Sequence, residues 1–329
     1  YQESAGVTGR QTSRQATRQR TRKPSSQRGQ VRGRLGNRNR KRNRRHGPIN
    51  ALKRSWRKAN WPTRIKMVLI PTVAVVVVVA LVAGLVRFTN WRAQVRAAEA
   101  AQLELTRTYD FNPGNIISDG QFFNGSAMSQ AEVQSFLDTQ GGSLAAMTFD
   151  TSNESGEGLC ADYTGTKGES AATIIDQSAR ACKVSQKVLL TVMQKEQHLV
   201  TAVDPSDYQL MAAMGLNCPD TADCDPAYAG FFRQVYGAAK RYRYYLEHEE
   251  QYGYTAHNLN YIQYHPNAAC GGAQVYIENK ATALLYIYTP YQPNIAALAA
   301  GNGTGDSCSS YGNRNFALIY TSWFGSPRS

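Results

Sequence analysis

The sequence from Ser185 to Val200 reads SQKVLLTVMQKEQHLV. Ser185 is a residue type that favours the N-cap of a helix. The apolar residues after it recur at spacings of three and four, which is typical of a helix that buries one face; they are Val188, Leu189, Val192, Met193, Leu199 and Val200. Glu196 falls inside this stripe, so a helical wheel places its side chain on the apolar face and not with Lys187 and Lys195.

A carboxyl group on an apolar face loses hydration, which disfavours its charged form. The sequence therefore predicts that Glu196 holds its proton near neutral pH, which is the condition for a general acid. The alternative is a glutamate at the edge of the stripe, with a carboxylate that reaches water or pairs with a cation. The helical wheel alone leaves both interpretations open.

The positive charge of the chain is confined to one end. Residues 1–66 hold 21 lysines and arginines and the single acid Glu3, a balance of +20, whereas residues 67–329 hold 16 against 23 acids, a balance of −7. The first segment has little to bury, so we expect a disordered basic tail. Such a tail has the charge to bind anionic lipid or nucleic acid. Because the sequence opens on Tyr1, we expect the natural chain to begin upstream.

Met67–Val86 contains twenty residues without a charge, about the length of a helix that spans a bilayer. We expect a single transmembrane helix over 67–87 and a helical stalk over 88–107, rich in Ala, Gln, Glu and Arg. The lysines and arginines before the apolar run predict a cytoplasmic N-terminus and an extracellular C-terminal domain. A buried core helix is the alternative.

All six cysteines follow the apolar run, which favours an oxidising compartment and three disulfides. Six cysteines allow 15 connectivities. Loop length favours the pairing of neighbours: Cys160 with Cys182, Cys218 with Cys224, and Cys270 with Cys308. A zinc site is the competing interpretation, and no C-x-x-C spacing supports it.

The exported part reads as mostly α with one small β-hairpin. Ser129 and Glu132 form a capping box for a short helix that ends at Gly141, within a small helical module over 108–142. Further helices are expected over 171–181, 226–248, from Asn279 to Pro290, and 313–323, and a hairpin over 261–264 and 274–277.

Of 19 tyrosines, 16 lie from Tyr208 onward. An aromatic ring offers a flat apolar face and the tyrosine hydroxyl donates a hydrogen bond, so tyrosines beside a buried glutamate favour a carbohydrate ligand. Most single tyrosines are expected in the core.

The segment VSQKVLLTVMQKEQHL resembles the lysozyme-like superfamily, especially goose-type lysozymes and soluble lytic transglycosylases, in which a similar helix ends in the catalytic glutamate. The resemblance covers about residues 171–325 and implies a lysozyme-like α+β domain over 143–329, with Glu196 as the catalytic acid and base. It further implies a substrate cleft lined by residues that we name as Gln197, Met214, Gly215, Tyr264, Tyr288 and Tyr291. Gln197 stands where those enzymes usually have Ser, and Asn217 where they have a Met-Gln pair. The motifs NIISD, HPNAACG and YGNRNF also resemble exported actinobacterial proteins, some labelled haemagglutinin.

The resemblance implies cleavage of peptidoglycan glycan strands. The usual glycosidase route needs two carboxylates, and Asp220, Asp223 and Asp225 are candidates for the second. A lytic transglycosylase needs only one, because the 6-hydroxyl of the sugar replaces water, and we favour this route. The motifs G-x-S-x-G, H-E-x-x-H and the Walker sequence are absent from the sequence, so no metal or cofactor is expected. A non-catalytic surface protein that binds wall glycan or a partner is the alternative.

Overall fold

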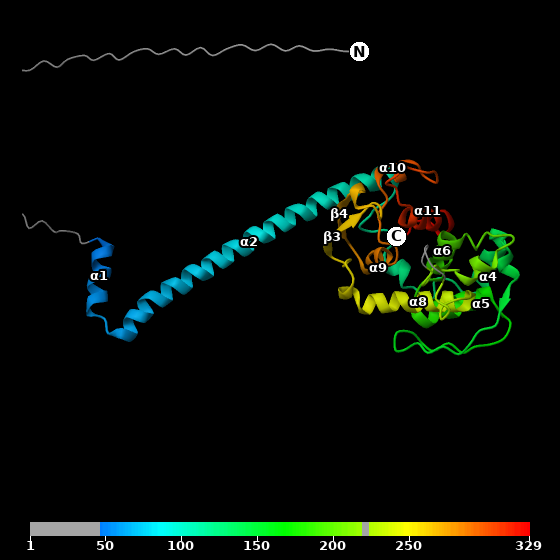
Figure 1. The fold of residues 1–329 in the computed structure, drawn as a ribbon, viewed down its shortest axis with the longest axis horizontal. Coiled ribbons are helices and arrows are strands. Elements are labelled where there is room, and N and C mark those ends of the chain that lie inside the picture. The colour runs from blue at the N-terminus through cyan, green and yellow to red at the C-terminus, as the bar shows by residue number, and fades with distance from the viewer. Residues whose placement is uncertain (1–46, 219–223) are drawn as a thin grey trace, which may run out of the picture. The chain divides into compact units, whose positions relative to one another are not determined.

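The computed structural model describes residues 47–218 and 224–329 (Figure 1). The described chain is mostly helical with two small antiparallel sheets, and it divides into two compact units between Ala74 and Val75. The helices are α1 (Pro48–Lys58), α2 (Trp61–Tyr109), α3 (Asp119–Phe122), α4 (Gln130–Gln140), α5 (Ala171–Cys182), α6 (Gln186–Gln197), α7 (Asp207–Met211), α8 (Phe231–Glu247), α9 (Lys280–Tyr288), α10 (Ile295–Ala299) and α11 (Gly312–Phe324). The strands are β1 (Thr148–Phe149), β2 (Glu169–Ser170), β3 (Asn258–Gln263) and β4 (Gly272–Ile277).

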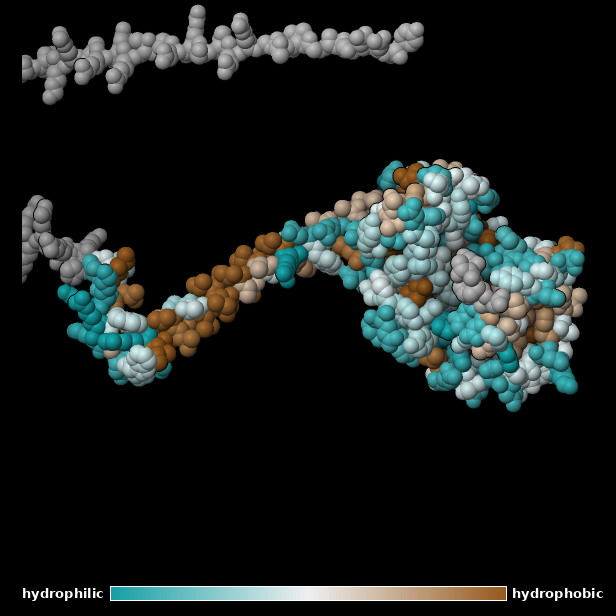
Figure 2. All heavy atoms as spheres, in the orientation of Figure 1, coloured by the Kyte–Doolittle hydropathy of each residue, from teal (hydrophilic) through white to brown (hydrophobic). Residues whose placement is uncertain are grey.

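The predicted transmembrane helix and stalk form one continuous helix, α2. Its apolar residues are exposed, and in Figure 2 they form a brown band along α2. This helix is long and apolar enough to cross a membrane. The last part of α2 is not a free stalk: Val95, Ala98 and Gln102 are buried, and the side-chain amide of Gln102 exchanges two hydrogen bonds with the backbone of Tyr276 in β4 (3.2 and 2.8 Å).

The prediction of disorder over 1–66 is wrong for its last part, because α1 and the start of α2 are helical; residues 1–46 lie outside the described part of the chain. Pro48 suits the first turn of α1, where its missing N–H has no partner to lose. Ile49, Leu52 and Trp56 then share one face of that helix. The helical spacing of these apolar residues thus explains why this stretch is a helix although its composition is mostly polar.

One hydrophobic core joins the segments after α2. It contains Ile116, Phe122 and Leu137 from residues 108–142 together with the buried faces of the later helices, so the small helical module and the rest of the domain share a core. α5 packs against α8, and α6 packs against α5 and α11. Figure 1 shows α5 and α8 side by side.

The local signals confirm several predicted elements. The capping box of Ser129 and Glu132 opens α4, and Gly141 (φ +73°) ends it. The Asn279 side chain caps α9 by accepting a hydrogen bond from the Thr282 N–H (2.8 Å). The predicted hairpin is present, with Asn260 paired to Val275 at its centre.

One helix start and one predicted cap differ from the prediction. α8 begins at Phe231 and not at Pro226, because Gly230 (φ +102°) turns the chain just before it. Ser185 precedes α6, but its hydroxyl makes no capping hydrogen bond and has no partner among the described atoms. Burial of the Ser185 side chain in the core prevents solvent from satisfying that group.

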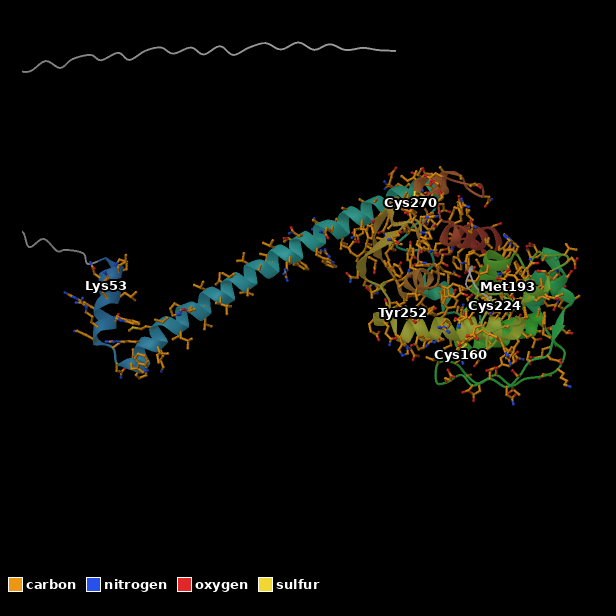
Figure 3. All side chains as sticks on the ribbon, in the orientation of Figure 1. Lys53, Cys160, Met193, Cys224, Tyr252 and Cys270 are labelled. Carbon is orange, nitrogen blue, oxygen red and sulfur yellow. A yellow bond between two sulfur atoms is a disulfide. The ribbon has the colours of Figure 1, made fainter. Side chains whose placement is uncertain are left out.

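The structure confirms all three predicted disulfides, Cys160–Cys182, Cys218–Cys224 and Cys270–Cys308. Figure 3 labels one cysteine of each. The Cys270–Cys308 bond ties the β3–β4 hairpin to the loop before α11, segments that are distant in sequence.

We predict that removal of the Cys270–Cys308 bond destabilises the domain more than removal of the Cys218–Cys224 bond. The first closes a sequence separation of 38 residues and the second one of 6, so loop-closure entropy gives losses of about 4 and about 2 kcal/mol. Denaturant unfolding of the two double Cys→Ser variants, followed by circular dichroism, measures the difference. Equal losses would show that loop closure does not govern these bonds.

Candidate functional site

Glu196 lies in the last turn of α6. The helix ends at Gln197 because His198 adopts a left-handed conformation (φ +53°), with its N–H bonded to the Gln194 carbonyl (2.9 Å). The residues before Glu196 on its face, such as Val192 and Met193, are fully buried, whereas the Glu196 side chain is 26% exposed. Glu196 therefore lies where the buried helix reaches the surface of the domain.

The Lys195 ammonium pairs with the Glu196 carboxylate, through Oε1. The helical wheel separated Glu196 from Lys195, but the Lys195 side chain reaches the carboxylate and is only 6% exposed. Its Nζ also donates to the Thr289 hydroxyl (3.1 Å) and lies 5.8 Å from the Tyr288 ring centroid. The long aliphatic stem of a lysine packs on apolar surface while its head finds acceptors. Glu196 is thus a charge-paired carboxylate, which is the alternative that the sequence left open.

Gly215 lies against the Glu196 carboxylate. It has a positive φ of +70°, and a Cβ built on it would lie 3.2 Å from Cδ and Oε2 of Glu196. The Glu196 carboxylate therefore lies close to the Gly215 backbone, in space that the Cβ of any other residue would crowd. The preceding residue, Met214, is fully buried, and its carbonyl accepts a hydrogen bond from the Tyr288 hydroxyl.

Two stacked tyrosines lie beside this carboxylate. The ring centroids of Tyr242 in α8 and Tyr288 in α9 are 5.0 Å apart. Burial raises the pKa of both hydroxyls well above the usual tyrosine value, and the negative charge of Glu196 adds to both shifts. Both hydroxyls therefore stay protonated at physiological pH. The Tyr242 hydroxyl is buried and has no hydrogen-bond partner among the described atoms.

The structure thus brings together four of the residues named from the sequence: Glu196, Met214, Gly215 and Tyr288. Gln197 adjoins them, and its carbonyl accepts a hydrogen bond from the Gln209 side chain of α7 (2.8 Å).

The other two named tyrosines make contacts elsewhere. Tyr264 lines a separate cavity of about 290 Å³ with Gln102 and Leu105 of α2. Tyr291 pairs with Gln263 of β3, and its carbonyl accepts a hydrogen bond from the Asn313 side chain (2.9 Å).

The candidates for a second carboxylate receive little support. Asp220 and Asp223 lie outside the described residues. Asp225 is exposed and caps its own turn by accepting a hydrogen bond from the Ala227 N–H (2.9 Å). Within residues 47–218 and 224–329, no group of three or more His, Cys, Asp or Glu side chains could hold a metal ion.

Sequence reasoning missed Lys195, Thr289 and Tyr242 as neighbours of Glu196. Tyr242 lies seven residues after Val235, on the buried face of α8, so its periodicity was a usable signal. No sequence signal pointed to Lys195, because adjacent helical residues normally point in different directions. Thr289 follows α9, so only the tertiary structure brings it to the Lys195 side chain.

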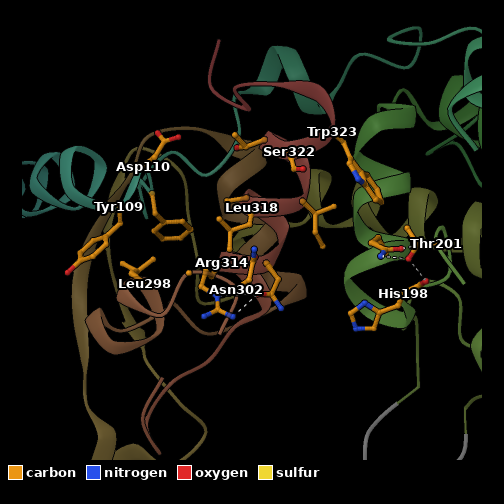
Figure 4. Close-up of a pocket in the computed structure, with 17 residues that line it drawn as sticks. Tyr109, Asp110, His198, Thr201, Leu298, Asn302, Arg314, Leu318, Ser322 and Trp323 are labelled. Atoms are coloured by element: carbon orange, nitrogen blue, oxygen red, sulfur yellow. Dashed lines mark hydrogen bonds between the residues drawn. The ribbon is translucent and has the colours of Figure 1, made fainter. Parts of the chain in front are cut away.

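A cavity of about 680 Å³ lies along α11 (Figure 4). It is lined by Gln194 and His198, which flank Glu196 in sequence, but not by Glu196 itself. In Figure 4, Tyr109 lies at one end, His198 at the other, and side chains of α11 between them. Aromatic rings (Tyr109, Trp323) and amide groups line the same space, a combination suited to a polar ligand with apolar faces.

The fold and the site define a mostly helical, disulfide-bonded domain with a charge-paired glutamate at the end of a buried helix. Residues 115–329 match the family described as LasA, N-terminal domain, and the chain belongs to that family. Comparison with curated proteins and with solved structures gave no match.

We predict that Gly215→Ala displaces the Glu196 carboxylate. A side chain at φ +70° costs about 1 to 2 kcal/mol in backbone strain, and the added Cβ crowds Oε2. Gly141→Ala is the matched control, since Gly141 has φ +73° and nothing within 4 Å of its Cβ position. Urea unfolding should show a larger loss of stability for Gly215→Ala. If the two losses are equal, Glu196 is not confined by Gly215.

Proposed function

We propose that this is a membrane-anchored protein whose exported domain cleaves the glycan strands of peptidoglycan, with Glu196 as the acid and base. The single observation that carries the proposal is the position of Glu196. Its carboxylate is partly exposed, at the end of a helix whose central residues are buried, and it is held between the Lys195 ammonium and the Gly215 backbone. This grouping of a helix-end glutamate, a glycine and a late tyrosine supports the lysozyme-like resemblance of the sequence.

We propose the one-carboxylate route, because Asp225, the candidate for a second carboxylate among the described residues, is exposed and bonded within its own turn. Glu196 gives its proton to the glycosidic oxygen as the bond to the anomeric carbon breaks, so the leaving sugar departs as an alcohol. The carboxylate then takes the proton of the sugar's own 6-hydroxyl as that oxygen bonds to the anomeric carbon, which yields an anhydro-sugar and restores the acid. Lys195 would compensate the charge of the carboxylate between the two steps.

A second candidate function is non-catalytic binding of wall glycan. The ion pair between the Lys195 ammonium and the Glu196 carboxylate favours this second function, because a carboxylate held in an ion pair is a poor proton donor. The cavity along α11 provides an alternative ligand site, with aromatic rings and amides and without Glu196.

The arrangement in the cell follows from the charge of the sequence. We propose that α2 spans the membrane once, with the basic residues before it in the cytoplasm and the disulfide-bonded domain outside. The tail before α1 would bind anionic lipid or nucleic acid through its arginines. Three disulfides agree with an oxidising exterior.

We predict that Glu196→Gln abolishes release of soluble fragments from purified cell walls. The amide cannot exchange a proton with the glycosidic oxygen, and loss of a general acid costs roughly 10²- to 10⁴-fold in rate. Glu247→Gln is the matched control, because that carboxylate is exposed and paired only loosely with Arg243 (3.8 Å). Mass spectrometry of the fragments distinguishes anhydro-sugar ends from hydrolysed ends.

The same wall preparation distinguishes the two candidate functions. The domain is a binding module if the unmodified chain and Glu196→Gln both release no fragments and both sediment with insoluble glycan. Weaker sedimentation of Asn302→Ala or His198→Asn would then show that it binds through the cavity along α11. Fragment release that persists in Glu196→Gln refutes the assignment of Glu196.

A further inference from the structure

The segment just before the apolar run of α2 is a basic amphipathic helix with exposed apolar side chains. Ile49, Leu52 and Trp56 of α1 are 70%, 68% and 40% exposed. On a helical wheel they occupy one side, Arg54 and Lys58 lie opposite, and Lys53 and Arg57 lie along one flank. Helices of this kind, with low overall hydrophobicity, lie in the headgroup region of a bilayer.

The charge of this segment is uncompensated within the sequence around it. Residues 47–66 contain six lysines and arginines, and the nearest acids are Glu3 and Glu99. The blue nitrogen tips of Lys53 and its neighbours project from α1 in Figure 3. An anionic surface is the complement of such a helix, and it is available where the chain enters a membrane.

Between α1 and the start of α2 there is an apolar notch of about 440 Å³, lined by Trp56, Trp61, Arg64, Ile65, Val68, Leu69 and Thr72. The Arg64 guanidinium lies 5.8 Å from the ring centroid of Trp56, and its Nε donates to the Trp56 carbonyl (3.1 Å). These contacts hold one cation at the rim of the notch. Trp61, at its edge, is 75% exposed.

We propose that residues 47–72 form a binding site for an anionic phospholipid. In this site α1 lies in the headgroup region with its cations, Arg57 among them, against the anionic surface, one acyl chain fills the notch, and Arg64 at its rim holds the phosphate. The apolar notch is continuous in sequence with the exposed apolar residues of α2, so an acyl chain that enters it stays in hydrocarbon. A guanidinium matches phosphate geometry through paired N–H donors. This inference rests on the proposed membrane anchor and is independent of Glu196.

The test uses the full chain reconstituted in symmetric vesicles. The chain has four tryptophans, and Trp91→Phe with Trp323→Phe leaves Trp56 and Trp61, both of which line the notch, as the reporters. Brominated acyl chains are placed either on phosphatidylglycerol or, at the same mole fraction, on phosphatidylcholine. We expect the fluorescence of these two tryptophans to be quenched at lower concentrations of the brominated anionic lipid.

Two variants identify the cations responsible. Each cation near an anionic surface favours binding by a factor of about five, so Arg57→Gln with Arg64→Gln should reduce the lipid preference about 25-fold. Arg87→Gln with Arg92→Gln is the control: it removes two cations from the other flank of the apolar run and should leave the lipid preference unchanged. Equal quenching by both lipids, or none, overturns the inference while the anchor stands. Release of the chain by alkaline extraction overturns the anchor and the inference together.

Discussion

The burial of α6 from Val188 to Met193 is the constraint on which the rest of the domain depends. Every residue from Val188 to Met193 is buried, in contact with α5 and α11. At its start the fully buried Gln186 side chain binds the Gly125 carbonyl, the Met128 N–H and the Asp176 carboxylate (2.9, 3.2 and 2.8 Å). A buried amide with all its partners in place is costly to rearrange, because each broken bond would leave an unsatisfied polar group. These bonds join α6 to α5 and to the loop before α4.

The position of Glu196 follows from this burial. A helix that is anchored at its start and buried through its middle holds its last turn in a fixed place. Gly215 and the stacked Tyr242 and Tyr288 then surround the carboxylate. The carboxylate is held by groups from three elements that are far apart in sequence, and an acid or a binding group fixed by rigid elements loses little entropy when it meets a ligand. The ion pair of Lys195 with this carboxylate is the feature that distinguishes the two interpretations: it compensates charge in the catalytic one and opposes proton donation in the binding one.

The first unit obeys a different constraint. Its helices bury none of their apolar residues in a protein core, and those residues remain exposed along α1 and the apolar run of α2. In the second unit, by contrast, α11 buries Phe316 and Tyr320 completely. Apolar surface of this extent requires a partner, and hydrocarbon is the one that needs no matching shape. The two units therefore suit different surroundings, which agrees with the division of charge along the sequence.

The sequence by itself determined the features that depend on near neighbours or on composition. Period, caps and apolar length were enough for α4, α6, α9, the apolar run and the hairpin, and short loop lengths were enough for the three disulfides. Only the tertiary structure decided the surroundings of Glu196. A helical wheel fixes the face of a residue but not what packs on that face, so the buried Lys195, its bond to Thr289 and the closeness of Gly215 had no local signal. The start of α8 was decided by the backbone of Gly230, and the docking of Gln102 on β4 by a contact across 174 residues. Long-range packing sets these contacts, since each depends on the whole core being assembled.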